Sequence, residues 1–242
     1  MEKVRERLRE RLEHQLEQQL KHFHGFLDFL SPRPPARRPS KPFQLIVFEG
    51  GEGSGKSTQA KALAEGLRRL GFRVVLTHEP GGTLLGNKLR RWLKWGRGIT
   101  TQAELLLFLA SRSQLVTNVI RPALEQNDIV ICDRFGASTF AYQGYGRGMD
   151  LSFLETLNNF VVNGLQPALV VLLDLEAEKG LDRKSVRLDV FEREEFVFHQ
   201  RVREGYLKMA AADPKRWMVV DASLSEEKVR EIIWERVKES LG

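Results

Sequence analysis

The chain has 242 residues, of which 42% are hydrophobic and 29% are charged. This is the composition of an ordinary globular protein, and no apolar run reaches the length of about 18 residues that a bilayer-spanning helix requires. The single cysteine, Cys132, excludes an internal disulfide framework and favours a reducing, cytoplasmic location. The charged, glutamate-rich N-terminal segment has the features of neither a signal peptide nor a mitochondrial transit peptide.

The formal net charge is +6, and its distribution is more informative than its size. Ten Lys and Arg residues and six Asp and Glu residues lie within residues 1–42, so the rest of the chain is close to neutral. We therefore expect no nucleic-acid partner, because nucleic-acid-binding domains carry a basic patch or stripe. The basic residues of the body are better explained by a function that involves phosphate groups.

Residues 1–30 are highly charged and carry an apolar stripe at helical spacing, which predicts an amphipathic helix. The stripe consists of Val4, Leu8, Leu12, Leu16, Leu20, Phe23, Leu27 and Leu30. Residues 31–42 are rich in proline and arginine and predict a linker. The helix could pack through its stripe, lie on an anionic membrane or remain a disordered tail. Its many glutamates argue against membrane binding, so packing is the favoured interpretation, and we expect no catalytic role for it.

From residue 43 to residue 242 the pattern alternates between strands and helices. Short apolar runs lie at Leu45–Phe48, Val74–Thr77, Ile129–Cys132, Leu169–Leu173 and Met218–Val220. Amphipathic stretches of helical length lie between them, for example Lys56–Leu70, Thr101–Glu125, Glu192–Ala212 and Ser225–Val237. Continuously apolar strands that alternate with helices predict a parallel sheet with helices on both faces.

The first predicted strand runs directly into a glycine-rich loop. Residues Gly50 to Ser57 match the pattern G-x-x-x-x-G-K-[ST] between a strand and a helix, the context that supports a phosphate-binding loop. We expect its backbone N–H groups to surround ATP phosphates, Lys56 to contact the β and γ phosphates, and Ser57 to bind Mg²⁺. The candidate ATP-binding residues are Gly50, Gly51, Glu52, Gly53, Ser54, Gly55, Lys56, Ser57 and Thr58.

A second charged pair lies at the end of the third predicted strand. Asp133 and Arg134 follow Ile129–Cys132, at the carboxyl edge of the sheet where ligands bind in open α/β folds. Asp133 could hold Mg²⁺ through water, and Arg134 could bind an acceptor phosphate. The alternative is a structural salt bridge between the two side chains.

Four stretches together resemble the bacterial-type thymidylate kinases of the P-loop nucleoside monophosphate kinase superfamily. They are Phe48–Gln59 (FEGGEGSGKSTQ), His78–Thr83 (HEPGGT), Leu107–Arg112 (LFLASR) and Asp133–Gly148, in which STFAYQGYGRG follows DRF. The resemblance implies a P-loop NTPase domain over residues 43–242, a three-layer α/β/α sandwich with a five-stranded parallel sheet. It also implies a homodimer that transfers phosphate from Mg-ATP to dTMP, giving dTDP for dTTP biosynthesis.

The resemblance further implies the acceptor site. Phe108 would stack on the thymine and Arg112 would contact the acceptor or its base, although Phe108 could instead be a core residue. Tyr142 would disfavour a ribose 2′-hydroxyl, and Gln143 or Thr139 would bond the pyrimidine edge. The candidate acceptor-binding residues are Glu52, Glu79, Phe108, Arg112, Arg134, Ser138, Thr139, Tyr142 and Gln143.

Two segments depart from the family pattern. His78 replaces a usual arginine, and a neutral imidazole binds phosphate less well than a guanidinium. The predicted lid, about residues 178–192, has Val190 where the family carries arginine. Arg183 and Arg187 remain as candidate catalytic cations, with Lys56, Asp133 and Arg134, although both could be solvated charges on a loop.

Two other functions remain open at this point. The chain could phosphorylate another deoxynucleotide or nucleoside, or it could be a non-catalytic nucleotide-binding assembly protein organised by the N-terminal helix. A GTPase switch is not expected, because no Asn-Lys-x-Asp element that reads guanine is present.

Overall fold

The computed structural model describes residues 44–96, 98–183, 191 and 194–241. The predicted helix of residues 1–30 and the linker of residues 31–42 lie outside these described residues, as do Arg187 and Val190 of the predicted lid. The domain boundary at residue 43 therefore stays a prediction.

The centre of the fold is a five-stranded parallel sheet with the order β2-β3-β1-β4-β5. The three inner strands are buried on both faces, which is why their sequences are continuously apolar. The two edge strands are only partly buried. The strands are β1 (Leu45–Glu49), β2 (Val74–His78), β3 (Ile129–Asp133), β4 (Leu169–Asp174) and β5 (Trp217–Asp221).

Helices connect the strands, and several begin at side chains that cap them. Thr83, Thr100 and Asp150 each accept a hydrogen bond from a backbone N–H of the first helical turn that follows. The helices are α2 (Lys56–Arg69), α3 (Leu84–Trp95), α4 (Thr101–Leu115), α5 (Arg121–Glu125), α6 (Gly136–Thr139), α7 (Leu151–Val162), α8 (Ala177–Asp182), α9 (Phe196–Ala212) and α10 (Glu226–Leu241). Two π-helical turns, η2 (Val116–Ile120) and η3 (Phe140–Gly146), continue α4 and α6.

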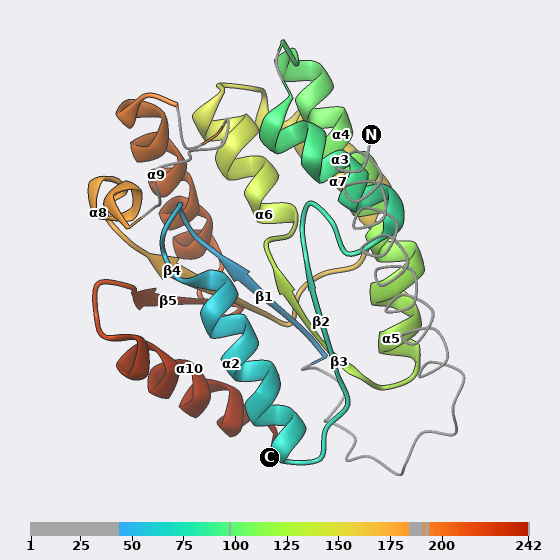
Figure 1. Cartoon of the computed structure of the whole chain (residues 1–242), viewed down its shortest axis with the longest axis vertical. Coiled ribbons are helices and arrows are strands. Elements are labelled where there is room, and N and C mark those ends of the chain that lie inside the picture. Colours follow the sequence, from blue (N-terminus) through green and yellow to red (C-terminus); the bar gives the residue numbers. More distant parts are fainter. Residues whose placement is uncertain (1–43, 97, 184–190, 192–193, 242) are drawn as a thin grey trace, which may run out of the picture. The chain divides into compact units, whose positions relative to one another are not determined.

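The helices cover both faces of the sheet (Figure 1). Ile46 and Phe48 of β1 point to one face and pack in a core with residues of α2 and α10. Leu45 and Val47 point to the opposite face, where the core includes residues of α4, η2, α5 and α7. Helix α9 covers the β4 end of that second face. The predicted three-layer α/β/α sandwich with a five-stranded parallel sheet is confirmed.

The predicted strands agree with the observed ones to within one residue at each end. The stretch Thr101–Glu125, predicted as one helix, is continuous but contains the π-helical turn η2. Helix α9 begins at Phe196, after the predicted start at Glu192. Helices α3, α7 and α8 were not anticipated; α7 exposes Phe153 and Phe160, so its apolar residues do not form one buried stripe.

The carboxyl ends of the strands carry the polar residues. Glu49 ends β1, His78 ends β2 and Asp133 ends β3, and the parallel register brings these three ends to one edge of the sheet. In open α/β sheets this edge is where ligands bind. Within the described residues, no helix has the length and apolar character needed to cross a membrane.

Candidate active site

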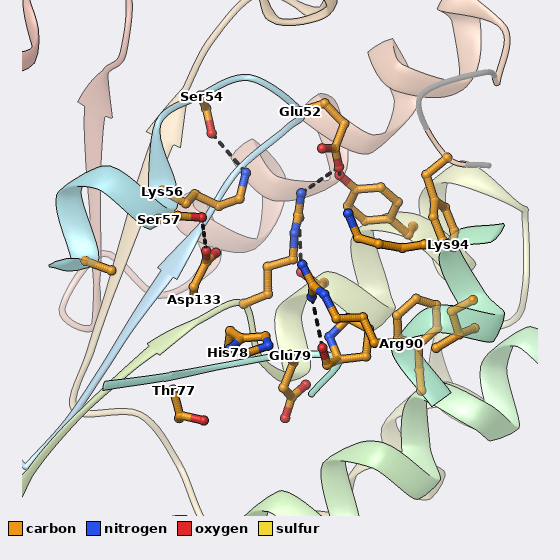
Figure 2. A pocket seen from close by; sticks show the side chains of 18 of the residues that line it. Glu52, Ser54, Lys56, Ser57, Thr77, His78, Glu79, Arg90, Lys94 and Asp133 are labelled. Carbon is orange, nitrogen blue, oxygen red and sulfur yellow. Dashed lines mark hydrogen bonds and ion pairs between the residues drawn. The ribbon is translucent and has the colours of Figure 1, made fainter. Parts of the chain in front are cut away.

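A cavity of about 670 Å³ opens at this edge of the sheet (Figure 2). Its size suits a small-molecule site. Residues 52–58 line one side, residues 76–80 line another, and side chains of α3, α4 and η3 complete the wall. The cavity therefore joins the glycine-rich loop to the Asp133–Gln143 segment.

The glycine-rich loop has a backbone that requires glycine at three positions. Gly50, Gly53 and Gly55 have φ angles of 142°, 67° and 86°, which are strained for residues with a side chain. Gly55 directly precedes α2, so the loop leads into the positive end of a 14-residue helix. Such a loop and helix start bind anions through backbone N–H groups.

Lys56 is folded back into the loop, and its side chain is largely buried. Its Nζ donates to the Gly51 carbonyl oxygen at 2.6 Å and to Ser54 Oγ at 3.1 Å. Burial, and then the charge of Arg134, lower the pKa of Lys56 to about 8. A bound phosphate would offer this ammonium group a negatively charged partner inside the loop.

Ser57 and Asp133 meet at the sheet edge, with the Ser57 hydroxyl donating to Asp133 Oδ2 (Figure 2). A hydroxyl beside a carboxylate is a suitable oxygen donor set for Mg²⁺, which is usually held by one or two protein oxygens, phosphates and water. In the described part of the chain, no group of three or more His, Cys, Asp or Glu side chains could hold a metal.

Arg134 follows Asp133 with a left-handed backbone, at a φ of 69°. Its side chain donates from Nη1 to the Gly50 carbonyl at 3.0 Å and from Nη2 to Glu52 Oε1 at 2.6 Å. Its guanidinium carbon lies 5.0 Å from the centre of the Tyr142 ring. Arg134 therefore spans from the phosphate loop to the predicted acceptor site, and it forms an ion pair with Glu52.

Glu49 is fully buried beneath the turn that contains Arg134. Its Oε1 accepts from the Phe135 backbone N–H at 2.9 Å, and its Oε2 accepts from Ser138 Oγ at 2.7 Å and from Tyr206 OH at 2.8 Å. Burial raises the pKa of Glu49, while these hydrogen bonds and the Arg134 charge oppose the rise. One carboxylate thus joins the end of β1 to the α6 segment and to α9.

Arg112 lies inside the protein with 1% of its surface exposed, at the back of the cavity. Its Nε donates to Glu79 at 2.8 Å, its Nη1 donates to Thr139 at 2.8 Å and to Asn158 at 3.0 Å, and its Nη2 donates to the Phe135 carbonyl at 3.1 Å. Burial raises the pKa of Glu79 to about 7, against the opposing charge of Arg112. Most N–H groups of this guanidinium therefore hold protein partners.

Phe108, Tyr142 and Gln143 all line the cavity. The Phe108 and Phe191 rings lie 5.7 Å apart. The Tyr142 hydroxyl donates to Glu52 Oε1 at 2.7 Å, which fixes the ring beside the phosphate loop. These aromatic rings form an apolar wall next to charged groups, an arrangement suited to a nucleotide.

Comparison with known proteins identifies the family. A family model described as thymidylate kinase matches residues 48–233. The chain is 52% identical over 196 residues to a thymidylate kinase of Dehalococcoides mccartyi, covering 80% of this chain and 95% of the relative. It is 46% identical to a thymidylate kinase of Thermomicrobium roseum, covering 81% and 94%. The chain belongs to the thymidylate kinase family.

The fold agrees with this family. The crystal structure of thymidylate kinase from Ehrlichia chaffeensis superimposes with a TM-score of 0.67 at 36% identity, covering 80% of this chain and 98% of the other. Membership of the thymidylate kinase family makes the chain a nucleoside monophosphate kinase, and phosphorylation of dTMP for dTTP synthesis is its activity.

His78 is one of the two departures from the family pattern noted in the sequence. It lines the cavity between β2 and the Arg90 and Lys94 side chains of α3. Burial, and then the charge of Arg90, lower the pKa of His78, so the imidazole is neutral near pH 7.

The described start of the lid contacts the phosphate loop through two glycines. An added Cβ at Gly53 would collide with the Gly180 carbonyl, and one at Gly180 would collide with the Glu52 carbonyl. Arg183 lines the cavity and donates from Nη1 to the Ala222 carbonyl at 3.0 Å. The catalytic roles of Arg183 and Arg187 stay predictions.

The sequence did not point to Glu49, Arg90, Lys94 or Tyr206 as site residues. Glu49 had a signal, because a carboxylate that ends an otherwise apolar buried strand needs hydrogen-bond partners. Arg90 and Lys94 lie on α3, a helix that the sequence pattern missed. Tyr206 had no signal, because a tyrosine on an amphipathic helix is usually a core residue.

The low pKa of Lys56 predicts a pH-dependent affinity for nucleotide. The free enzyme loses the Lys56 charge above about pH 8, and bound phosphates favour the charged form. The affinity for nucleotide should therefore be constant below pH 8. Above pH 8 it should fall by up to about tenfold per pH unit. Calorimetric titration with a non-hydrolysable ATP analogue from pH 7 to pH 9.5 measures this.

A matched control is Lys56→Arg, whose guanidinium does not titrate in this range. Its affinity should show no such decline. A flat pH profile for the unmodified protein would contradict the inference.

Proposed function

We propose that the chain transfers the γ-phosphoryl group of ATP to dTMP by in-line displacement, giving dTDP and ADP. The observation that carries this proposal is a single cavity that contains both a phosphate-binding loop and an aromatic acceptor wall, with Arg134 between them. Phosphoryl transfer depends mainly on positioning and on stabilisation of charge. The arrangement of the loop, Arg134 and the aromatic rings supports both requirements.

The ATP phosphates would lie on the loop of residues 50–57. Backbone N–H groups, the start of α2 and Lys56 would hold the transferring group and stabilise the charge that develops on it. Arg134 would bind the phosphate of dTMP, exchanging part of its contact with Glu52. The acceptor phosphate is already anionic, so no general base is required. Arg183 and Arg187 would add positive charge from the lid.

Mg²⁺ would be held at Ser57 and Asp133, in part through water, and would neutralise charge on the ATP phosphates when bound. The support is the contact between the Ser57 hydroxyl and the Asp133 carboxylate at the mouth of the loop. Asp133 is positioned for this role by β3, whose register places it beside Phe48 and His78.

The nucleoside of dTMP would lie against the aromatic wall, with Phe108 stacked on the base. Tyr142 would occupy the space that a ribose 2′-hydroxyl needs, because its hydroxyl is fixed by Glu52. Glu79 would contribute to dTMP binding indirectly, by holding Arg112, to which it is hydrogen-bonded. Ser138 would also contribute indirectly, by holding the turn that contains Arg134, since its hydroxyl is bonded to Glu49.

Initial rates of ADP release with dTMP, dUMP, dCMP and thymidine test the substrate assignment. We expect the highest kcat/KM with dTMP, a value for dCMP lower by about 100-fold or more, and no turnover of thymidine, which lacks the phosphate that Arg134 would bind. Chelation of Mg²⁺ should abolish activity. A preference for another acceptor would contradict the assignment, and ATP binding without any turnover would favour the non-catalytic alternative.

We further propose that the protein is a cytoplasmic homodimer. The single cysteine is free and buried, which suits a reducing compartment. Three neighbouring helices expose large apolar side chains: Trp92 of α3, Leu106 of α4, and Phe153 and Phe160 of α7. Phe160 is 83% exposed, and exposed large apolar side chains on neighbouring helices support a protein–protein interface there.

Sedimentation analysis tests this interface. The full chain should have about twice the mass of one 27.8 kDa chain, and Phe160→Glu should weaken the dimer by about 100-fold or more. Phe196→Glu, on the exposed start of α9, is the matched control and should remain dimeric. A monomeric unmodified protein, or equal effects of the two variants, would contradict the proposal.

A further inference from the structure

Gln143 lies in the wall of the main cavity with a hydrogen bond on one side only. The residue belongs to η3, is 1% exposed and lines the cavity. Its Nε2 donates to Glu104 Oε1 at 2.9 Å. Within the described part of the chain, its Oε1 makes no hydrogen bond, and it is not one of the buried side-chain atoms left without a partner. The amide therefore has a protein partner at its nitrogen, in a side chain that lines the main cavity.

Glu104 lies behind Gln143 and is a buried carboxylate of α4. Arg147 donates to it from Nε at 3.2 Å and from Nη2 at 3.0 Å, and also pairs through Nη1 with Glu194 at 2.7 Å. These residues line a separate, smaller cavity of about 190 Å³. The Glu104 carboxylate thus accepts hydrogen bonds from Arg147 at both of its oxygens, as carboxylates paired with a guanidinium do.

Glu104, as the acceptor in these contacts, allows only one orientation of the Gln143 amide. If the amide were turned by 180°, its oxygen would face the carboxylate oxygen, and two acceptors would lie in contact without a proton between them. The NH₂ group must therefore face Glu104. The carbonyl oxygen is then the polar atom that Gln143 offers to a ligand in the main cavity.

We propose that Glu104 is a positioning residue that fixes the Gln143 amide as a hydrogen-bond acceptor toward the acceptor base. A base with an N3–H group, as in thymine and uracil, donates to this oxygen. Cytosine has a lone pair at N3, which would face the oxygen without a proton. Glu104 therefore contributes to the selection of an imide base without touching the nucleotide. This inference rests on the proposed function and adds a determinant of its specificity.

The size of the effect follows from the chemistry. A site that hydrogen-bonds a particular N–H group strongly rejects an analogue that lacks this group, because the site's own polar atom is then left unpaired. This discrimination is stronger than the discrimination of an apolar pocket between ligands that differ by one methylene. Discrimination therefore depends on the amide being unable to turn. If Glu104 becomes a neutral amide, either orientation of Gln143 finds a partner, and the acceptor and donor forms can both reach the ligand.

The experiment compares dissociation constants of dTMP and dCMP for the full chain and for Glu104→Gln, with kcat/KM for both nucleotides. We expect the ratio of the two affinities to fall by about tenfold or more in Glu104→Gln, mainly through tighter binding of dCMP. N3-methyl-dTMP, which lacks the donor, should bind the unmodified protein at least tenfold more weakly than dTMP. A merely structural role would lower both affinities in the same proportion.

Two further variants keep the test decisive. Arg147→Lys retains a cation beside Glu104 and should preserve the dTMP preference. The double variant Glu104→Gln with Gln143→Glu places a permanent acceptor toward the base and should again exclude dCMP. It keeps the test possible even if the single variant Glu104→Gln is poorly stable. An unchanged affinity ratio in Glu104→Gln would overturn the inference while dTMP turnover stands, whereas the absence of dTMP turnover in the unmodified protein would overturn the proposed function itself.

Discussion

The proposed acceptor half of the site depends on one buried carboxylate, Glu49, and on the turn that it holds. The backbone of Arg134 is in the left-handed region, which is unfavourable by about 1–3 kcal/mol for a residue with a side chain and persists only where surrounding contacts enforce it. The Arg134 N–H donates to the Phe48 carbonyl at 2.9 Å, and the next N–H, of Phe135, donates to Glu49. These bonds fix the direction of the chain after β3.

The turn has a direct consequence for the chemistry. Asp133 ends the strand beside Ser57, whereas Arg134 points to Gly50 and Glu52. In the proposed mechanism, adjacent residues would therefore serve the metal side and the acceptor side of one phosphate loop. Glu49 also accepts from Tyr206 of α9, so the same carboxylate ties the helix behind Tyr142 to the loop. The site is assembled from β1, β3, η3 and α9 through this small network.

Much of the fold and of the phosphate-binding half could be predicted from local patterns. The buried strands are short and continuously apolar, and the loop Gly50–Ser57 has a fixed spacing that demands particular backbone angles. The acceptor residues came mainly from the family resemblance, because Phe108 and Tyr142 have no local pattern that separates a ligand contact from a core contact. Glu104 and Tyr206 were missed because their roles arise from contacts between distant segments. The roles of the lid residues Arg187 and Val190 stay predictions, because both residues lie outside the described part of the chain.

The most direct test of the central claim is the pair of variants Glu49→Ala and Glu49→Gln, with the KM for dTMP and the Kd for an ATP analogue measured on folded protein. Glu49→Ala leaves the Phe135 N–H without its partner, so the KM for dTMP should rise by about tenfold or more while ATP affinity changes less than about twofold. Glu49→Gln retains an acceptor oxygen and should keep most of the affinity for dTMP. An unchanged KM for dTMP in Glu49→Ala, or an equal loss of ATP affinity, would contradict the account.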